Sequence, residues 1–278
     1  MNPWPWTDDP ILRVHKFTNV FRELDRGTVW CREWIREPYA DDPELFFNIA
    51  TYRRYNWIDT AAELGYIHQY DPDRYNGLMM RRQARGEQIF TGAHMICGTI
   101  RDPETGEIPY SKVEQVFRIS FKLLWDNRHE MTLYLEEGGH TLEQAFNRMM
   151  GLPYPGYGAF VCYEVVSDLR WTRYLKDAPD VLSWANPGPG AKRGIIRLYG
   201  YSPKDEGNPR FSNKEYIQAM QYLLYISPRY LQDHVPDLEM RDVEHSLCEW
   251  DKYTRVLKGE GKTRSKYNPP KWAIGKQV

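Results

Sequence analysis

The segment LPYPGYG, residues 152–158, lies between an amphipathic stretch and the apolar run 159–169. A short glycine turn between two helices can direct backbone N–H groups at a phosphate, because glycine has no Cβ to block the approach and tolerates positive φ. The sequence therefore predicts a helix-hairpin-helix over about 141–169 that grips DNA. The residues expected to contact the DNA are Pro155, Gly156, Tyr157 and Gly158.

The tip of such a hairpin is an exposed place, so we expect Tyr154 and Tyr157 to face solvent. The alternative is a helix–loop–helix in which the glycines serve chain reversal alone. Glycine turns are common, and the motif does not by itself decide between the two interpretations.

Apolar residues elsewhere recur at spacings of three or four, which is typical of helices. The expected fold is all-α, either one domain over 1–278 or two helical lobes with a cleft, followed by a basic, irregular tail over about 258–278. Helices are predicted over residues 17–22, 28–35, 43–52, 57–64, 73–85, 111–126, 142–150, 159–169, 214–226 and 240–256.

The composition is that of an ordinary globular protein, with 278 residues of which 41% are hydrophobic and 27% charged. This length can bury a substantial core. The formal net charge of −1 argues against a protein that coats DNA nonspecifically, so any DNA contact should be confined to a local surface.

Metal and membrane sites are not expected. The four cysteines lie far apart, and the seven histidines lack the HExxH spacing of a zinc site. Magnesium could accompany a pyrophosphate, which would itself provide most of the ligands. No apolar run approaches ~20 residues and no signal-like start is present, so a cytoplasmic location is expected.

A second glycine-rich segment, GPGAKRG at 188–194, is expected to form another turn, and it carries Lys192 and Arg193. Upstream of it lie Asp177 and Asp180. Cations and N–H groups beside carboxylates can stabilise a departing anion as well as bind one. The alternative is a basic pair that contacts DNA phosphates.

Two further polar clusters stand out. CEWDKYTR at 248–255 falls on a predicted helix, where Glu249, Lys252 and Arg255 could share one charged pocket with Asp251; an exposed, salt-bridged helix face is the alternative. The N-terminal cluster contains Asn19, Arg22, Glu23, Asp25 and Arg26, for which a buried structural ion-pair network is the rival interpretation.

The hairpin and the aspartates beyond it resemble DNA glycosylases of the helix-hairpin-helix type, which place an essential Asp about twenty residues past the hairpin. Ala159 and Phe160 stand where the lyase lysine of that family would be, and the cysteine cluster of its iron–sulfur members is missing. The resemblance thus implies a glycosylase-like fold and disfavours a strand-cutting enzyme.

A narrower resemblance rests on several motifs together: FTNVFRELDRGTVW at 17–30, FTGAHMICG at 90–98, PGYGAFVCYEVVSDLRWT at 155–172, GPGAKRG and CEWDKYTR. They are similar to the alpha-glutamyl/putrescinyl thymine pyrophosphorylase family of phage enzymes, over most of 15–257. A related helical domain accompanies a 5-hydroxymethyluracil DNA kinase, but the GxxxxGK[ST] loop that a kinase needs does not occur here.

This resemblance implies a transferase that acts on double-stranded DNA. An amino acid or polyamine would replace the pyrophosphate on the methylene of a modified pyrimidine that is rotated into a cleft. Asp180, or else Asp177, would take the proton from the amine. Gly188, Gly190, Lys192, Arg193, Lys252 and Arg255 would hold the pyrophosphate. Tyr52, Tyr55 or Trp57 could stack on the base.

Two other functions stay open at this point. A monofunctional glycosylase would remove a modified pyrimidine and use Asp180 to activate water or stabilise the sugar. A non-catalytic DNA-binding partner of a hydroxymethyluracil DNA kinase would need only the hairpin.

Overall fold

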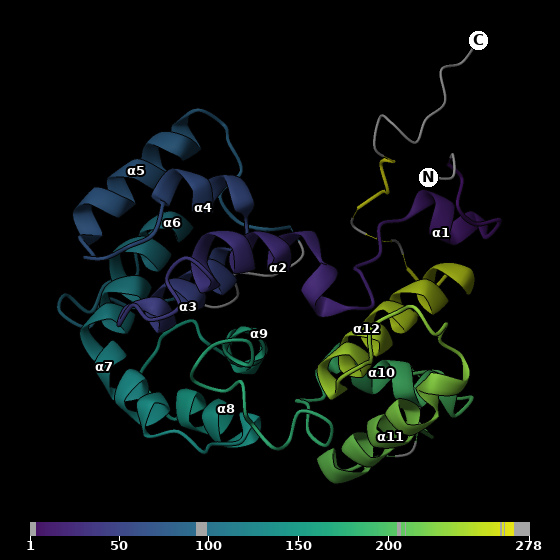
Figure 1. The fold of residues 1–278 in the computed structure, drawn as a ribbon. Helices are drawn as coiled ribbons and strands as arrows, with labels where there is room; N and C mark the ends of the chain where they lie inside the picture. Colours follow the sequence, from purple (N-terminus) through teal and green to yellow (C-terminus); the bar gives the residue numbers. More distant parts are fainter. Residues whose placement is uncertain are drawn as a thin grey trace. The chain divides into compact units, whose positions relative to one another are not determined.

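The computed structural model describes residues 4–92, 99–204, 207–208, 210–261, 263 and 265–269. These residues form helices and loops without a β-strand, and an isolated bridge joins His15 to Lys266. The predicted all-α fold is confirmed. Contacts divide the chain into two compact units, which Figure 1 shows as ribbons. We call Arg26–Val181 the central unit, and Met1–Asp25 with Leu182–Val278 the terminal unit.

The central unit is built around two almost fully buried helices, α3 and α9, which pack against each other. All eleven residues of α3 are buried, and the polar ones among them, Asn48, Thr51, Arg53 and Arg54, are buried together with its apolar residues. Its helices are α2 (Arg26–Cys31), α3 (Leu45–Tyr55), α4 (Ile58–Leu64), α5 (Pro72–Ala84), α6 (Lys112–Glu114), α7 (Phe121–Glu137), α8 (Leu142–Met150) and α9 (Ala159–Leu169), with π-helical segments η2 (Arg32–Arg36) and η3 (Gln115–Ser120).

The predicted hairpin helices have the bounds that the sequence indicated. Helix α8 begins at a capping box, in which the Thr141 hydroxyl accepts from the Gln144 N–H and the Gln144 side chain accepts from the Thr141 N–H. This arrangement satisfies two of the N–H groups that a helix start leaves unpaired. The helix starts at Leu142 because the cap fixes it there.

The terminal unit contains α1 (Pro10–Val14), the 3₁₀ turn η1 (Arg22–Leu24), α10 (Pro189–Leu198), α11 (Asn213–Ile226), the 3₁₀ turn η4 (Ser227–Arg229) and α12 (Met240–Leu257). Helix α10 runs along α12, and α1 contacts α12 from the N-terminal segment. Both ends of the chain are therefore needed to complete this unit.

Two local predictions for the terminal unit are wrong. No helix forms over 17–22, where an extended segment leads into the short turn η1. The segment GPGAKRG is not a turn but the start of α10, with Pro189 at the first helical position, where its missing N–H costs no hydrogen bond. Its glycines serve helix packing instead of chain reversal.

Some predictions fall outside the described residues. Residues 93–98 of the motif FTGAHMICG belong to this group, as do Lys262, Arg264 and Lys271 of the basic tail. Among the described helices, none has the length and apolar character that crossing a bilayer requires.

Candidate functional site

The hairpin turn of the central unit is packed inward. Tyr154 and Tyr157 are only 4% and 6% exposed, so the expectation that they face solvent is wrong. The Tyr157 hydroxyl donates to the Ala50 carbonyl over 3.2 Å, and the Ser120 hydroxyl donates to the Pro155 carbonyl. Burial of a phenol ring stabilises the fold by removing apolar surface from water, and the Tyr157 hydroxyl keeps a hydrogen-bond acceptor in α3.

Gly156 has a structural reason for being glycine. Its φ is +85°, and a Cβ at this position would lie 2.6 Å from a terminal guanidinium nitrogen of Arg54. Gly158, by contrast, is exposed at the start of α9, and its Cβ would meet nothing within 4 Å. The part of the hairpin that is open to a DNA phosphate is therefore the N-terminus of α9, where Phe160 is also 49% exposed.

Asp180 caps a helix. Its carboxylate accepts the N–H of Leu142 over 2.7 Å and that of Glu143 over 3.1 Å, so both oxygens are engaged at the start of α8. The residue is 9% exposed. Asp177, three residues earlier, has an exposed side chain. The structure thus gives Asp180 a structural task and leaves Asp177 open to solvent.

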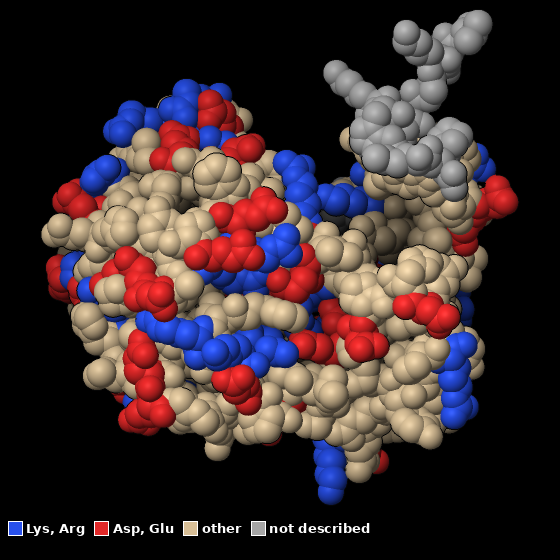
Figure 2. Space-filling view, viewed as in Figure 1, with Lys and Arg blue, Asp and Glu red and all other residues tan. Residues whose placement is uncertain are grey.

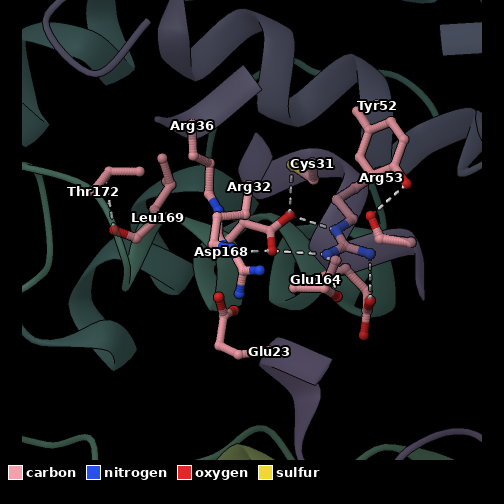
Figure 3. A network of polar contacts seen from close by, with 12 residues as sticks. Glu23, Cys31, Arg32, Arg36, Tyr52, Arg53, Glu164, Asp168, Leu169 and Thr172 are labelled. Carbon is pink, nitrogen blue, oxygen red and sulfur yellow. Dashed lines mark hydrogen bonds and ion pairs between the residues drawn. The ribbon is translucent and has the colours of Figure 1, made fainter. Parts of the chain in front are cut away.

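A buried ion-pair network lies in the central unit and was not foreseen from the sequence (Figure 3). The Asp168 carboxylate on α9 accepts from Arg53 on α3, over 2.5 Å from Nε and 2.8 Å from a terminal nitrogen. Arg53 also donates to the Thr28 hydroxyl over 2.9 Å. Arg36 approaches Asp168 at 4.0 Å, and Glu164 approaches Arg53 at 3.9 Å.

This network holds the core together and is closed to a macromolecular substrate, since Arg53 and Asp168 are each 1% exposed. Burial opposes the charge of Arg53, but Asp168 outweighs it and raises the pKa of that guanidinium well above its ordinary value. Burial also raises the pKa of the neighbouring Cys31 thiol, which keeps it protonated. Periodicity gives no signal for such a pair, because the partners are 115 residues apart.

The prediction that Tyr52 or Tyr55 stacks on a base is wrong, because neither ring is accessible. Tyr52 and Tyr55 are 0% and 3% exposed and belong to the core. Tyr52 is, however, the innermost of three stacked rings, in the order Tyr52, Trp30 and Trp34. The ring centres are 5.3 Å apart between Tyr52 and Trp30 and 6.4 Å apart between Trp30 and Trp34. Trp34, on the π-helical segment η2, is 62% exposed, so it is the ring of this stack that solvent reaches.

In the terminal unit, three arginines surround one buried carboxylate. Asp251 of α12 is 0% exposed and accepts from Nε of Arg193 over 2.9 Å and Nε of Arg197 over 2.8 Å. Nε of Arg255 lies 3.4 Å from the same carboxylate, and Arg197 also donates to Glu260 over 2.7 Å. We call Arg193, Arg197 and Arg255 the arginine cluster. Arg197, one helical turn after Arg193, was not among the residues predicted from the sequence.

Lys192 and Arg193 do not form a joint site, because they point to different neighbours. The Lys192 ammonium donates to the Asn213 side chain over 2.8 Å and lies 5.3 Å from the centre of the Tyr216 ring, both on α11. Arg193 faces α12. Since successive residues of a helix point about 100° apart, a helical GPGAKRG separates the two cations that a turn could have brought together.

The opposite side of α12 carries a second polar pair. The Lys252 ammonium donates to Glu249 over 2.5 Å and lies 4.8 Å from the centre of the Phe17 ring. Glu249 also accepts from the N–H of Thr18 over 3.2 Å. A helix residue and the N-terminal segment are thereby joined through one carboxylate.

Beside this pair is a cavity of about 430 Å³ between the N-terminal segment and α12, which we call the α12 cavity. Its lining residues are Asp9, Leu12, Phe17, Thr18, Val20, His245, Ser246, Glu249, Trp250 and Tyr253. The Tyr253 hydroxyl donates to Asp9 over 2.6 Å, which lowers the pKa of Asp9. The Ser246 hydroxyl is buried and has no hydrogen-bond partner in the described part of the chain.

The prediction of one charged pocket formed by Glu249, Lys252 and Arg255 together with Asp251 is wrong. Asp251 and Arg255 face α10, whereas Glu249 and Lys252 face the N-terminal segment. The helix itself lies between the two groups, since residues two apart on a helix point in nearly opposite directions. The cavity and the arginine cluster cannot serve the same reacting atom.

The N-terminal polar cluster has structural contacts. The Arg22 N–H donates to Asp242 over 2.9 Å, and Glu23 pairs with Arg241 at 3.3 Å. The Asn19 side chain accepts from the N–H of Phe21, and Asp25 ends the turn η1. This arrangement matches the rival interpretation, a partly buried ion-pair network that fixes the entry of the chain into α12.

Charges of both signs are interspersed on the face of the central unit seen in Figure 2. In the described residues, no group of three or more His, Cys, Asp or Glu side chains is arranged to hold a metal ion.

The described residues form an all-helical domain, and a family model assigns it to a family. The chain belongs to the family described as 5-hmdU DNA kinase, helical domain, whose model matches residues 1–263. The 5-hmdU DNA kinase of Bacillus phage SP10 is 26% identical over 269 residues, which cover 90% of this chain and 40% of that protein. The chain thus corresponds to less than half of that relative. No solved structure matches it.

This family is the helical domain that accompanies a 5-hydroxymethyluracil DNA kinase, which is related to the thymine pyrophosphorylases that the motifs resemble. Membership of the narrower pyrophosphorylase family stays a prediction, as does the glycosylase-like character of the hairpin.

Proposed function

We propose that this chain acts on DNA during thymine hypermodification and replaces the pyrophosphate of 5-(pyrophosphoryloxymethyl)uracil with an amine. The family supports a role on hydroxymethylated thymine, since its description names 5-hmdU DNA. The motifs shared with the pyrophosphorylases support the transfer reaction. The observation that carries the proposal is the α12 cavity, where Glu249 lies beside aromatic walls.

The cavity has the chemistry to hold an amine. Two carboxylates, Asp9 and Glu249, line it, and the ammonium of Lys252 contacts Glu249. Phe17, Trp250 and Tyr253 offer ring faces, and cations are attracted to such faces. Lys252 already shows the arrangement, because its ammonium contacts both Glu249 and the Phe17 ring.

In the proposed reaction, the ammonium of the donor gives one proton to Glu249, which leaves a lone pair on nitrogen. This lone pair attacks the methylene carbon of the base, a C–N bond forms, and the C–O bond breaks with its electron pair moving to pyrophosphate. The product amine then loses its remaining extra proton to solvent. The ammonium of Lys252 donates to Glu249 over 2.5 Å and is therefore the cation next to the proposed base.

Glu249 is preferred to Asp180 as the base because of what each carboxylate already does. Both carboxylates have partners, Asp180 in two backbone N–H groups at the start of α8 and Glu249 in Lys252 and the Thr18 N–H, but only Glu249 borders a cavity that can hold a substrate. Asp177 is the exposed alternative in the central unit.

The test uses a duplex with a single 5-(pyrophosphoryloxymethyl)uracil, incubated with the chain and a set of amines. We expect an amine-dependent gain in nucleoside mass and release of pyrophosphate. Glu249→Gln should lower the rate about 10²- to 10⁴-fold, as expected for loss of a general base. Asp233→Asn, an exposed carboxylate of the same unit, is the matched control and should keep the rate. Full activity of Glu249→Gln would contradict the assigned base.

The second candidate function is a DNA-binding partner of a 5-hmdU DNA kinase, which the family itself favours. It is tested by adding the chain to a 5-hmdU DNA kinase that lacks its own helical domain. Restored phosphorylation together with no amine transfer would favour the partner function. Release of a free base in either experiment would favour a glycosylase.

A further inference from the structure

We infer that the arginine cluster on the α10 side of α12 is a binding site for a phosphate group, supplied by the DNA backbone. The inference deepens the proposed function and rests on it for DNA as the ligand. It concerns a different face of α12 from the α12 cavity, so the two sites can be tested separately.

The packing of α10 on α12 builds the site. A Cβ at Gly190 would lie 2.7 Å from the Cys248 sulfur, and one at Gly194 would lie 2.4 Å from the Leu247 carbonyl oxygen. These two glycines, one helical turn apart, let the helices approach more closely than larger residues allow. Because the two helices lie so close together, Arg193 and Arg197 of α10, which are also one turn apart, both hydrogen-bond to Asp251 of α12.

The charges in the site do not cancel. Three guanidinium groups meet two carboxylates, Asp251 and Glu260, which leaves one positive charge in excess. The Arg197 side chain is only 3% exposed. One of its terminal nitrogens is buried and has no hydrogen-bond partner among the described residues. A buried donor without a partner costs free energy unless a ligand satisfies it.

The two outer arginines are accessible and oriented. The side chains of Arg193 and Arg255 are 41% and 38% exposed; Arg193 donates to Asp251 through Nε over 2.9 Å, and Nε of Arg255 forms an ion pair with the same carboxylate at 3.4 Å. The terminal nitrogens then remain as donors in the fork geometry that binds a phosphate oxygen pair. Because Asp251 holds these long side chains before the ligand arrives, less rotamer entropy is lost on binding.

A backbone phosphate fits the site better than the leaving pyrophosphate. The leaving group must lie on the far side of the methylene from the attacking amine. An amine in the α12 cavity therefore cannot face a pyrophosphate on the opposite side of the same helix. A phosphodiester of the flanking DNA has no such constraint.

The experiment measures binding of a fluorescent DNA duplex by anisotropy at several salt concentrations, and binding of sodium pyrophosphate by calorimetry. We expect Arg193→Gln and Arg255→Gln each to weaken duplex binding about tenfold and to reduce the salt slope by about one. Arg229→Gln, an exposed arginine of the same unit, is the matched control and should change neither quantity. Arg193→Lys keeps the charge and checks that any loss in Arg193→Gln is not caused by misfolding.

The outcomes separate the possibilities. Weaker duplex binding with unchanged pyrophosphate binding supports the inference as stated. Weaker pyrophosphate binding alone overturns the backbone assignment and returns the cluster to the leaving group. Unchanged affinity for both ligands overturns the site altogether. Absence of amine transfer by the wild-type chain would contradict the proposed function, whereas the DNA affinities of the variants would still report on the site.

Discussion

Glycines at the residue scale decide how closely the helices of each unit can pack. Gly194 and Gly77 are both helical, but their surroundings differ. A Cβ at Gly194 would collide with the Leu247 carbonyl at 2.4 Å, whereas one at Gly77 would lie 3.5 Å from the flexible end of Arg81. The same substitution should therefore have opposite effects at the two positions.

We expect Gly194→Ala to destabilise the protein by about 1–3 kcal/mol, because α10 must move away from α12. Gly77→Ala should stabilise α5 by about 0.5–1 kcal/mol, since alanine loses less backbone entropy in a helix. Urea unfolding of the two variants measures both effects. An equal shift in the two would show that propensity rather than helix contact determines the outcome.

The two aspartates near the hairpin can be separated by stability. Asp180→Ala should destabilise the protein by about 1–2 kcal/mol, because the N–H groups of Leu142 and Glu143 lose their acceptor. Asp177→Ala should stay within about 0.5 kcal/mol, as for other exposed positions. Thermal unfolding checks this pair. A stable Asp180→Ala protein that is nevertheless inactive would restore Asp180 to the reaction.

At the scale of elements, the α3–α9 contact depends on a buried charge pair. Asp168→Asn keeps the shape of the side chain but leaves Arg53 charged in the core, because Asn carries no compensating charge. We expect a loss of about 3–5 kcal/mol, typical of breaking a buried pair by removing one partner. Asp126→Asn, at an exposed pair with Lys122, should cost under about 1 kcal/mol and is the matched control. Denaturant unfolding compares the two.

The contact between α1 and α12 should weaken in acid. The Tyr253 hydroxyl holds the pKa of Asp9 below its ordinary value. A carboxyl whose folded pKa is lowered contributes stability above its unfolded pKa, near 4, and loses that contribution as pH falls through the lower folded pKa. The stability difference between wild type and Tyr253→Phe should therefore be present at pH 6 and shrink below about pH 4. Unfolding curves across this range measure it, and a difference that is independent of pH would contradict the assignment to Asp9.

At the scale of the whole molecule, the two units differ in how the chain builds them. The central unit is one continuous segment, Arg26–Val181, whereas the terminal unit combines Met1–Asp25 with Leu182–Val278. The first of these terminal segments also supplies one wall of the α12 cavity, through Asp9, Phe17 and Thr18.

We expect the fragment 26–181 to fold by itself, since α3 and α9 are buried within it. Circular dichroism should show a helical spectrum and a cooperative melt. Removal of residues 1–25 from the full chain should instead lower the stability of the terminal unit, because α12 loses its contacts with Thr18 and Asp9. A fragment 26–181 without cooperative unfolding would show that the division into units is not one of folding.

The all-α class and most helices could be predicted from the sequence, because helical periodicity and caps act over only a few residues. The bounds 142–150 and 159–169 were predicted as the structure has them. The sequence also indicated Arg193, Asp251 and Arg255 as candidate site residues. Both arginines form ion pairs with Asp251, although the two motifs are more than fifty residues apart.

The direction in which each of these side chains points depends on how the helices pack, and it could not be predicted from the sequence. GPGAKRG became a helix because α12 offered a surface for Gly190 and Gly194, and that helix sent Lys192 and Arg193 in different directions. Likewise, the pairing of Arg53 with Asp168 leaves no local pattern in the sequence. Contacts between distant segments depend on the geometry of packing, which no short-range propensity contains.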